Sequence, residues 1–173
     1  MVPRFAFGPR FPIGAFSLLL SMAAWLAAGL LVVLPAAADD PPIFSLQWGG
    51  PGAGNGQFNQ PDGSAIDASG NIYVADIENN RIQKFDANGN FILTWGTLGG
   101  SDGQFSRPMG VDVDAAGNVY VVEFFGTRVQ KFDSNGTFLL RWGTPGSGDG
   151  QFASPRDITV DGAGNVFVTD NGN

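Results

Sequence analysis

Branched and aromatic residues alternate with polar residues in four short runs between residues 56 and 102. The runs cover residues 64–67, 71–76, 81–86 and 90–95. Each is four to six residues long, which suits β-strands and is too short for helices. The pattern therefore predicts four antiparallel strands in this stretch.

Glycine and aspartate separate these runs. Gly70 and Gly89 each stand in an Asp-x-x-Gly-Asn sequence that begins at Asp67 or Asp86. Glycine adopts the positive φ that a tight hairpin needs, and the aspartate side chain hydrogen-bonds to its own turn. We therefore expect hairpins at these two positions.

The whole pattern repeats with a fixed period of 47 residues. The copies cover residues 56–102, 103–149 and 150–173, and the third has only two predicted strands, at about 156–161 and 165–170. A repeat of this length is typical of propeller blades, whereas the coils of a β-solenoid have shorter periods. The sequence predicts an all-β fold, a β-propeller built from four-stranded antiparallel blades and incomplete in this chain.

The repeats resemble those of the NHL family of β-propellers. The resemblance depends on a GQF…P opening, a D-x-x-G-N-x-[YF]-V-x-D core, an N-x-R-[IV]-Q-K-F-D strand and a closing G-x-F-x-x-x-W-G. It covers about residues 43–173, or two and a half repeats, and the second copy departs from it at Glu123 and Gly126. Residues 43–48 match the last strand of a blade, because Trp48 aligns with Trp95, and they predict an orphan outer strand.

The resemblance implies a six-bladed ring, which needs more strands than this chain supplies. We therefore expect residues 39–173 to be a partial propeller from a longer protein, with several chains completing one ring as the alternative. Unpaired strands at open blade edges would favour self-association.

The first 38 residues differ in kind from the repeats. They contain Arg4 and Arg10, a long apolar run and an Ala36-Ala37-Ala38 ending. A basic start, an apolar run and small residues at the end are typical of a secretory signal peptide. The apolar run is also long enough for an uncleaved membrane anchor. In both cases we expect residues 39–173 to be exported, either to the periplasm or outside the cell.

The charge of the exported part argues against nucleic acid as a partner. The chain has nine Lys and Arg and sixteen Asp and Glu; without Arg4 and Arg10, seven basic residues remain, for a formal charge of −9. No basic cluster is present in the sequence, whereas nucleic-acid binding depends on one. The sequence contains no cysteine, so the fold relies on packing instead of disulfides.

The chain also contains no histidine, which excludes His-based triads and zinc sites with histidine ligands. NHL-like propellers include amidating lyases and streptogramin lyases that depend on histidine, so this activity is not implied here. We predict a non-catalytic module for protein or glycan binding or scaffolding, with no cofactor, no metal and no catalytic residue assigned.

Two other functions stay open. The first is a calcium-dependent lactonase-like or lyase-like enzyme, for which Glu123, Asp170 and Asn171 are candidates. The second is the extracytoplasmic sensor domain of a membrane-anchored protein. Asp112, Asp114, Gly117 and Glu123 match positions of an EF-hand calcium loop, but strands flank them, so we favour a plain hairpin.

Three carboxylates end the second strand of successive copies, namely Asp76, Glu123 and Asp170. A ring of carboxylates can hold a metal or a cationic ligand. We favour a structural role, with hydrogen bonds in the adjacent loop or ion pairs to Arg81 and Arg128. The repeated Phe58, Phe105 and Phe152 are expected to fill the gaps between blades.

The best candidate for a binding site is the face where the repeats vary most. Two kinds of loop meet there: those between the second and third strands of a blade, and those that join one blade to the next. The candidate residues on this face are Asp62, Glu78, Asn79, Met109, Phe124, Phe125 and Arg156. Phe124 and Phe125 are either an exposed contact patch or a packing contact with a neighbouring blade.

Overall fold

The computed structural model describes residues 46–173. The leader predicted at residues 1–38 and the first half of the orphan strand predicted at 43–48 lie outside the described residues. Within residues 46–173 every regular element is a β-strand, and no membrane-spanning helix occurs there. The strands are β1 (Gly50–Pro51), β2 (Gln57–Phe58), β3 (Pro61–Ile66), β4 (Ile72–Asp76), β5 (Arg81–Phe85), β6 (Phe91–Trp95), β7 (Pro108–Val113), β8 (Val119–Glu123), β9 (Arg128–Phe132), β10 (Phe138–Trp142), β11 (Thr144–Pro145), β12 (Gln151–Phe152), β13 (Pro155–Val160) and β14 (Val166–Asp170).

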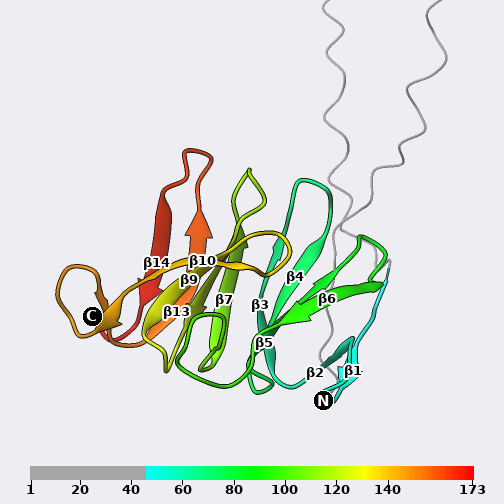
Figure 1. Cartoon of the computed structure of the whole chain (residues 1–173), viewed down its shortest axis with the longest axis horizontal. Coiled ribbons are helices and arrows are strands. Elements are labelled where there is room, and N and C mark those ends of the chain that lie inside the picture. The colour runs from blue at the N-terminus through cyan, green and yellow to red at the C-terminus, as the bar shows by residue number, and fades with distance from the viewer. Residues whose placement is uncertain (1–45) are drawn as a thin grey trace, which may run out of the picture. The chain divides into compact units, whose positions relative to one another are not determined.

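The strands form two complete blades and one hairpin, as the repeat predicts. Blade 1 is an antiparallel sheet in the order β3-β4-β5-β6, and blade 2 is its copy in the order β7-β8-β9-β10. Blade 3 consists of the antiparallel pair β13-β14. Figure 1 shows the three sheets side by side in chain order. The prediction of four-stranded antiparallel blades is confirmed.

The segment before each blade contains a short parallel pairing that the sequence pattern did not predict. β1 pairs with β2, β11 pairs with β12, and Leu98 forms a single parallel bridge with Phe105 between them in sequence. Pairings of one or two residues are too short to produce an alternation that could be recognised.

Residues 46–49 carry no strand, so the second half of the predicted orphan outer strand is not observed. The aligned tryptophan is nevertheless in the expected place. Trp48 packs against Phe85 with ring centroids 6.0 Å apart, and Trp95 packs against Phe132 at 5.8 Å. The repeated tryptophan therefore marks a side-chain contact with the following blade, which does not require a strand at Trp48.

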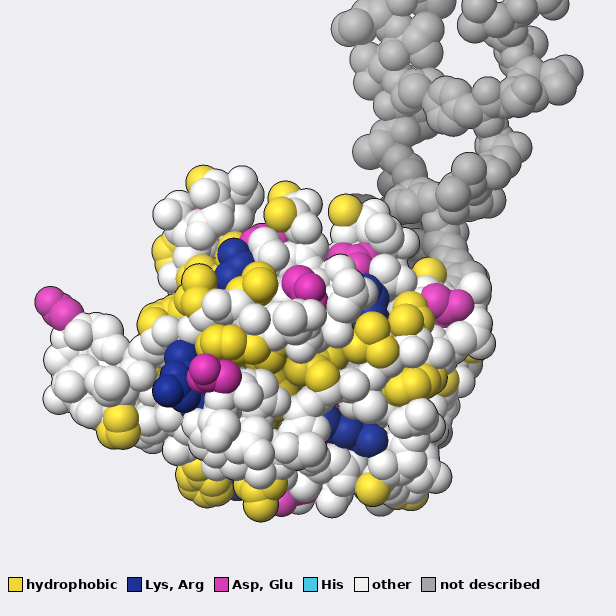
Figure 2. Space-filling model, in the orientation of Figure 1, with side chains coloured by type: hydrophobic (Ala, Val, Ile, Leu, Met, Phe, Trp, Pro, Cys, Tyr) yellow, Lys and Arg dark blue, Asp and Glu magenta, His cyan; other side chains and the backbone are white. Residues whose placement is uncertain are grey.

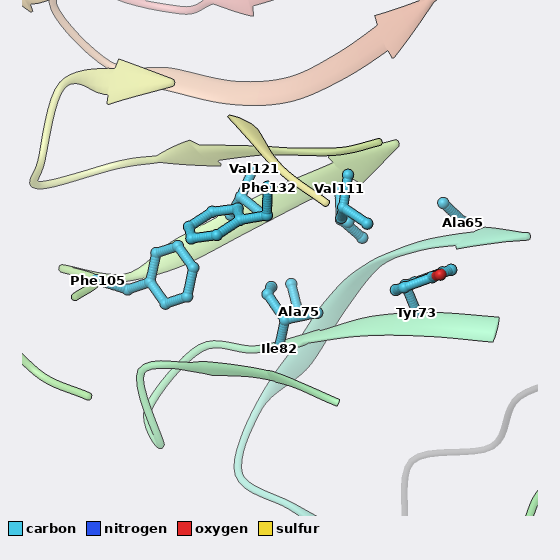
Figure 3. Packing of buried hydrophobic residues seen from close by; sticks show 9 residues of the cluster. Ala65, Tyr73, Ala75, Ile82, Phe105, Val111, Val121 and Phe132 are labelled. Atoms are coloured by element: carbon cyan, nitrogen blue, oxygen red, sulfur yellow. The ribbon is translucent and has the colours of Figure 1, made fainter. Parts of the chain in front are cut away.

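The main core lies between blades 1 and 2. Tyr73, Ala75 and Ile82 of blade 1 face Val121 and Phe132 of blade 2, and all five are fully buried. Phe105 fills the space between the two sheets (Figure 3), so its predicted role is confirmed. Burial of one such aromatic side chain contributes about 1.5–3 kcal/mol to stability.

Glycine at one position of the inner strand allows the blades to approach closely. A Cβ atom on Gly63 would lie 2.3 Å from the carbonyl oxygen of Met109, and one on Gly110 would lie 2.8 Å from the Cα of Asp157. Neither distance leaves room for a side chain. These two glycines therefore set the spacing of the inner strands β3, β7 and β13.

The predicted hairpins are confirmed at Asp67 and Asp86. Gly70 and Gly89 have φ values of 83° and 81°, and their N–H groups donate to the carbonyl oxygens of Asp67 and Asp86. The Asp86 carboxylate accepts two further bonds from Asn90, one from the side-chain amide at 2.8 Å and one from the backbone at 2.9 Å.

These turns predict a loss of stability in acid. The hydrogen bonds from the Asn90 and Asn165 side chains lower the pKa of Asp86 and Asp161 below the ordinary value of 3.8. A carboxyl with a lowered pKa in the folded state stabilises the fold above its unfolded pKa, and this contribution disappears as the pH falls through the folded pKa. We expect the free energy of unfolding in urea to be flat above about pH 5 and to fall below about pH 4. The double variant D86N/D161N should reduce this slope, and an unchanged slope would contradict the assignment.

Candidate functional site

The two kinds of variable loop meet, as the sequence predicts. We call the connection between the second and third strands of a blade the B–C loop, and the connection from one blade to the next the D–A loop. In blade 2, the backbone N–H groups of Phe124 and Phe125 donate to the carbonyl oxygens of Arg107 and Ser106 at 3.0 and 3.3 Å. In blade 1, Glu78 donates to Asn59 at 3.1 Å in the same way. We call the surface formed by these paired loops the loop face.

The carboxylates that end the second strands are structural. Asp76 and Glu123 are fully buried and form ion pairs with Arg81 and Arg128 at 2.8 and 2.6 Å. Each of the three carboxylates also accepts a bond from a backbone N–H of the D–A loop. The donors are Asn59 for Asp76, Ser106 for Glu123 and Ser154 for Asp170, at 2.7, 2.8 and 2.7 Å. The predicted ion pairs of Asp76 with Arg81 and of Glu123 with Arg128 are confirmed.

Arg128 ties its D–A loop to the blade through further bonds. Its guanidinium donates to the carbonyl oxygens of Gly100 and Gln104 at 2.5 and 2.9 Å. Arg81 makes the equivalent bonds to Ala53 and Gln57 at 2.8 and 2.9 Å. In each blade the buried ion pair therefore holds the D–A loop in place against the B–C loop, and these two loops form the loop face.

The acidic residues that match positions of an EF-hand loop make hydrogen bonds within the fold. The carboxylate of Asp112 accepts bonds from the backbone of Val160 at 2.6 Å and the hydroxyl of Thr159 at 3.2 Å, so it links blade 2 to blade 3. Asp114 forms a plain hairpin, in which Gly117 donates to its carbonyl oxygen at 2.9 Å. Residues 46–173 contain no group of three or more acidic side chains placed to hold a metal.

Four side chains of the loop face form a cluster of two aromatic rings and two guanidinium groups. Phe124 and Phe125 lie with ring centroids 5.1 Å apart and planes at 59°. The guanidinium carbon of Arg107 lies 5.3 Å from the Phe125 ring, and that of Arg156 lies 5.5 Å from the Phe124 ring. Phe124 is half-buried, whereas 62% of the surface of Phe125 is exposed. Phe125 is therefore the exposed contact residue of the pair, and Phe124 makes the packing contact with the neighbouring blade, through Arg156.

The cluster breaks the symmetry of the repeat. At the boundary of blades 1 and 2, Glu78 pairs with Arg107 at 3.2 Å. The residues 47 positions later, at the boundary of blades 2 and 3, are Phe125 and Ser154, which cannot form an ion pair. The first boundary is thus closed by an ion pair, and the second presents an exposed aromatic ring.

A shallow hollow of about 420 Å³ lies next to the cluster. Three of the candidate residues, Asp62, Met109 and Arg156, come together there from the inner strands of the three blades. The hollow is lined by Asp62, Gly63, Ser64, Met109, Gly110, Arg156 and Asp157. Asn79 has a different role, because its side-chain amide donates to Asp76 and to the carbonyl oxygen of Gly52, both at 2.9 Å. It supports the loop from within.

Arg107 is the functional candidate that sequence reasoning missed. It lies directly before Pro108, where the other copies have Gln60 and Ser154. The residue at this position differs between copies, which is the same signal that identified Met109 and Phe124 as candidates. Its backbone φ of 57° lies in the left-handed region, which a non-glycine residue seldom adopts.

Two four-stranded antiparallel sheets packed face to face, followed by a hairpin that pairs as their first two strands do, are typical of a β-propeller. Solved propellers superimpose on the chain. A catalytically inactive virginiamycin B lyase from Staphylococcus aureus with quinupristin has a TM-score of 0.53 at 20% identity, over 74% of this chain and 38% of that one. A streptogramin B lyase has a TM-score of 0.51 at 21% identity, over 64% and 34%. At these identities the likeness shows the fold alone.

The first repeat matches a known repeat family. Residues 58–85 match the family model described as NHL repeat. Protein lin-41 of Caenorhabditis elegans is 47% identical over 47 residues, which is 27% of this chain and 4% of that protein. Protein brain tumor of Drosophila melanogaster is 45% identical over 49 residues, 28% of this chain and 5% of that protein. The predicted resemblance to NHL-repeat propellers is confirmed, while the chain spans only a small part of these relatives.

Proposed function

We propose that this chain is an exported, non-catalytic propeller module that binds a protein or glycan through the loop face. The observation that carries the proposal is the exposed Phe125, stacked by Arg107 beside an open hollow. Large apolar side chains held in place at an exposed site are typical of contact surfaces. Export is inferred from the basic and apolar leader at residues 1–38.

The composition of the cluster supports a protein partner more than a glycan. Aromatic residues, methionine and arginine are enriched at protein interfaces relative to the rest of the surface. The cluster and hollow combine Phe124, Phe125, Met109, Arg107 and Arg156. The two rings are tilted to each other by 59°, so they do not form one flat platform.

The distribution of charge supports a partner other than nucleic acid. Lys and Arg side chains are dispersed among acidic ones on the face shown in Figure 2 and do not merge into a continuous basic patch. The chain also has a formal charge of −7. A polyanion gains most of its affinity from clustered basic residues, which this surface does not offer.

The binding role is tested by selecting a random peptide display library on the full chain. We expect the selected peptides to lose binding to the variant Phe125→Ser, because the ring is exposed and its removal does not disturb the core. Leu139→Ser is the matched control, since Leu139 is 47% exposed on the outer strand β10. Peptides that bind both variants and the native chain equally would place the contact elsewhere.

A calcium titration separates this proposal from a lactonase-like enzyme. Glu123, the first candidate ligand, already accepts bonds from Arg128, Gln130 and Ser106. We therefore expect calorimetry with calcium chloride to show no tight site and the melting temperature to stay constant. Tight binding at one site with a raised melting temperature would favour the enzyme.

A further inference from the structure

We propose that the boundary of blades 2 and 3 recognises a peptide segment that carries a single carboxylate next to an apolar side chain. Arg156 receives the carboxylate and Phe125 contacts the apolar side chain. This inference rests on the proposed function and specifies the chemistry of its partner.

Arg156 is placed to receive a ligand. It extends from β13 of blade 3 to the Phe124 ring of blade 2, 5.5 Å from the ring centroid. Its side chain is exposed and makes no ion pair or hydrogen bond with any residue in the described part of the chain. A guanidinium held over a ring keeps N–H donors that can bind a carboxylate with two parallel bonds.

The neighbouring arginine is different, although it stacks in the same way. Arg107 donates to the Glu78 carboxylate at 3.2 Å, so its charge is already balanced. Of the two guanidinium groups in the cluster, only that of Arg156 lacks a carboxylate partner. A ligand carboxylate at Arg156 would give the second boundary an ion pair, at a repeat position different from that of the Arg107–Glu78 pair.

The charges around Arg156 favour one carboxylate over a polyanion. Asp62 and Asp157 line the same hollow as Arg156. Two fixed carboxylates beside one guanidinium repel a chain of phosphates or uronic acids, whereas a single carboxylate can reach the guanidinium edge and avoid them. A peptide with one Asp or Glu and neutral neighbours meets this requirement.

Phe125 supplies the apolar part of the contact. Its exposed ring lies 5.1 Å from Phe124, whose other neighbour is the Arg156 guanidinium. A carboxylate at Arg156 and an apolar group on Phe125 are therefore separated by one ring. That separation corresponds to side chains two residues apart on an extended peptide, because alternate side chains point to the same face and each residue adds about 3.3 Å.

The test uses the random peptide library selected on the full chain, with binding measured against three substitutions of arginine. We expect the selected peptides to carry Asp or Glu within two residues of an aromatic or aliphatic residue. Arg156→Gln should weaken their binding at least tenfold, and Arg156→Lys should weaken it less, because lysine keeps the charge but loses the paired N–H geometry. Arg141→Gln changes the net charge equally at an exposed ion pair on β10 and should leave binding unchanged.

Synthetic peptides sharpen the result. Replacing the acidic residue of a selected peptide by its neutral amide should weaken binding to the native chain as much as Arg156→Gln does, and the two changes together should have no larger effect. Peptides that depend on Phe125 but are indifferent to Arg156 would overturn this inference and leave the proposed function in place. Peptides that depend on neither residue would overturn both. A third outcome is that the library yields no binding peptide, while an immobilised polyuronate binds the native chain and does not bind Arg156→Gln. That outcome would show that the occupant is not a peptide.

Discussion

Replacing Arg128 with methionine should lower the free energy of unfolding by about 3–5 kcal/mol, the range observed when one partner of a buried ion pair is removed. Glu123 has no exposed surface, and its carboxylate lies 2.6 Å from the Arg128 guanidinium. Methionine fills a similar volume but leaves that charge without its partner. It also removes the bonds to Gly100 and Gln104, so the D–A loop should loosen together with the blade. Urea unfolding followed by tryptophan fluorescence measures the change.

Arg141→Met is the matched control for this prediction. Arg141 also pairs with a carboxylate, that of Asp102 at 3.1 Å, but both side chains are about half exposed. Exposed ion pairs contribute about 0–1 kcal/mol, so this variant should unfold close to the native chain. If the two methionine variants lost equal stability, the buried pair would not have the structural role assigned to it.

The strands were predictable from the sequence because their signals are local. The run predicted at residues 81–86 is β5, Arg81–Phe85, and the one predicted at 90–95 is β6, Phe91–Trp95. One Asp-x-x-Gly-Asn turn, at residues 86–90, fixes where β5 ends and β6 begins. No strand is observed at residues 46–48 of the predicted strand 43–48. The alignment of Trp48 with Trp95 indicated where a side chain packs, and it carried no information on backbone pairing. Trp48 packs as its repeat position requires, but a strand also needs a neighbouring backbone to pair with.

The candidate site was predictable only in outline. Variation between copies located the loop face, and the structure joins its loops by backbone hydrogen bonds. That variation could not show that Asn79 points inward to Asp76 while Phe125 is exposed, since both are variable residues of B–C loops, one in blade 1 and the other in blade 2. The contacts of Arg107 and Arg156 cross blade boundaries, over distances in sequence at which no local pattern specifies a partner. Such contacts depend on how the blades pack together.

The same comparison of blades explains both departures of the second copy from the NHL motif. In blade 1, Asp76 accepts a bond from the Asn79 side chain at 2.9 Å. In blade 2 these two positions hold Glu123 and Gly126. A Cβ atom on Gly126 would lie 2.5 Å from a carboxylate oxygen of Glu123. The longer glutamate thus occupies the space that asparagine fills in blade 1, and the two differences form one compensated change.

A double-mutant cycle should show this coupling. Gly126→Asn alone should lower the free energy of unfolding by about 1–3 kcal/mol, the range for overpacking a filled site. Glu123→Asp alone should lower it by about 1 kcal/mol, because it removes a buried methylene group and leaves a gap. The variant E123D/G126N recreates the blade 1 arrangement and should recover most of the loss. We expect a favourable coupling of about 0.5–3 kcal/mol between the two positions.

The reverse exchange in blade 1 provides the control, since D76E should be destabilising alone and tolerated together with N79G. Urea unfolding of the single and double variants measures the free energies of unfolding for both double-mutant cycles, that of blade 1 and that of blade 2. If the losses of E123D and G126N simply added, Glu123 and Gly126 would not share a space, and the second blade would have to accommodate the longer carboxylate by another route. Recovery in both blades would show that one buried carboxylate and the residue three positions after it are chosen together. Their combined size then determines how the B–C loop sits against the D–A loop, and with it the position of the exposed ring of Phe125.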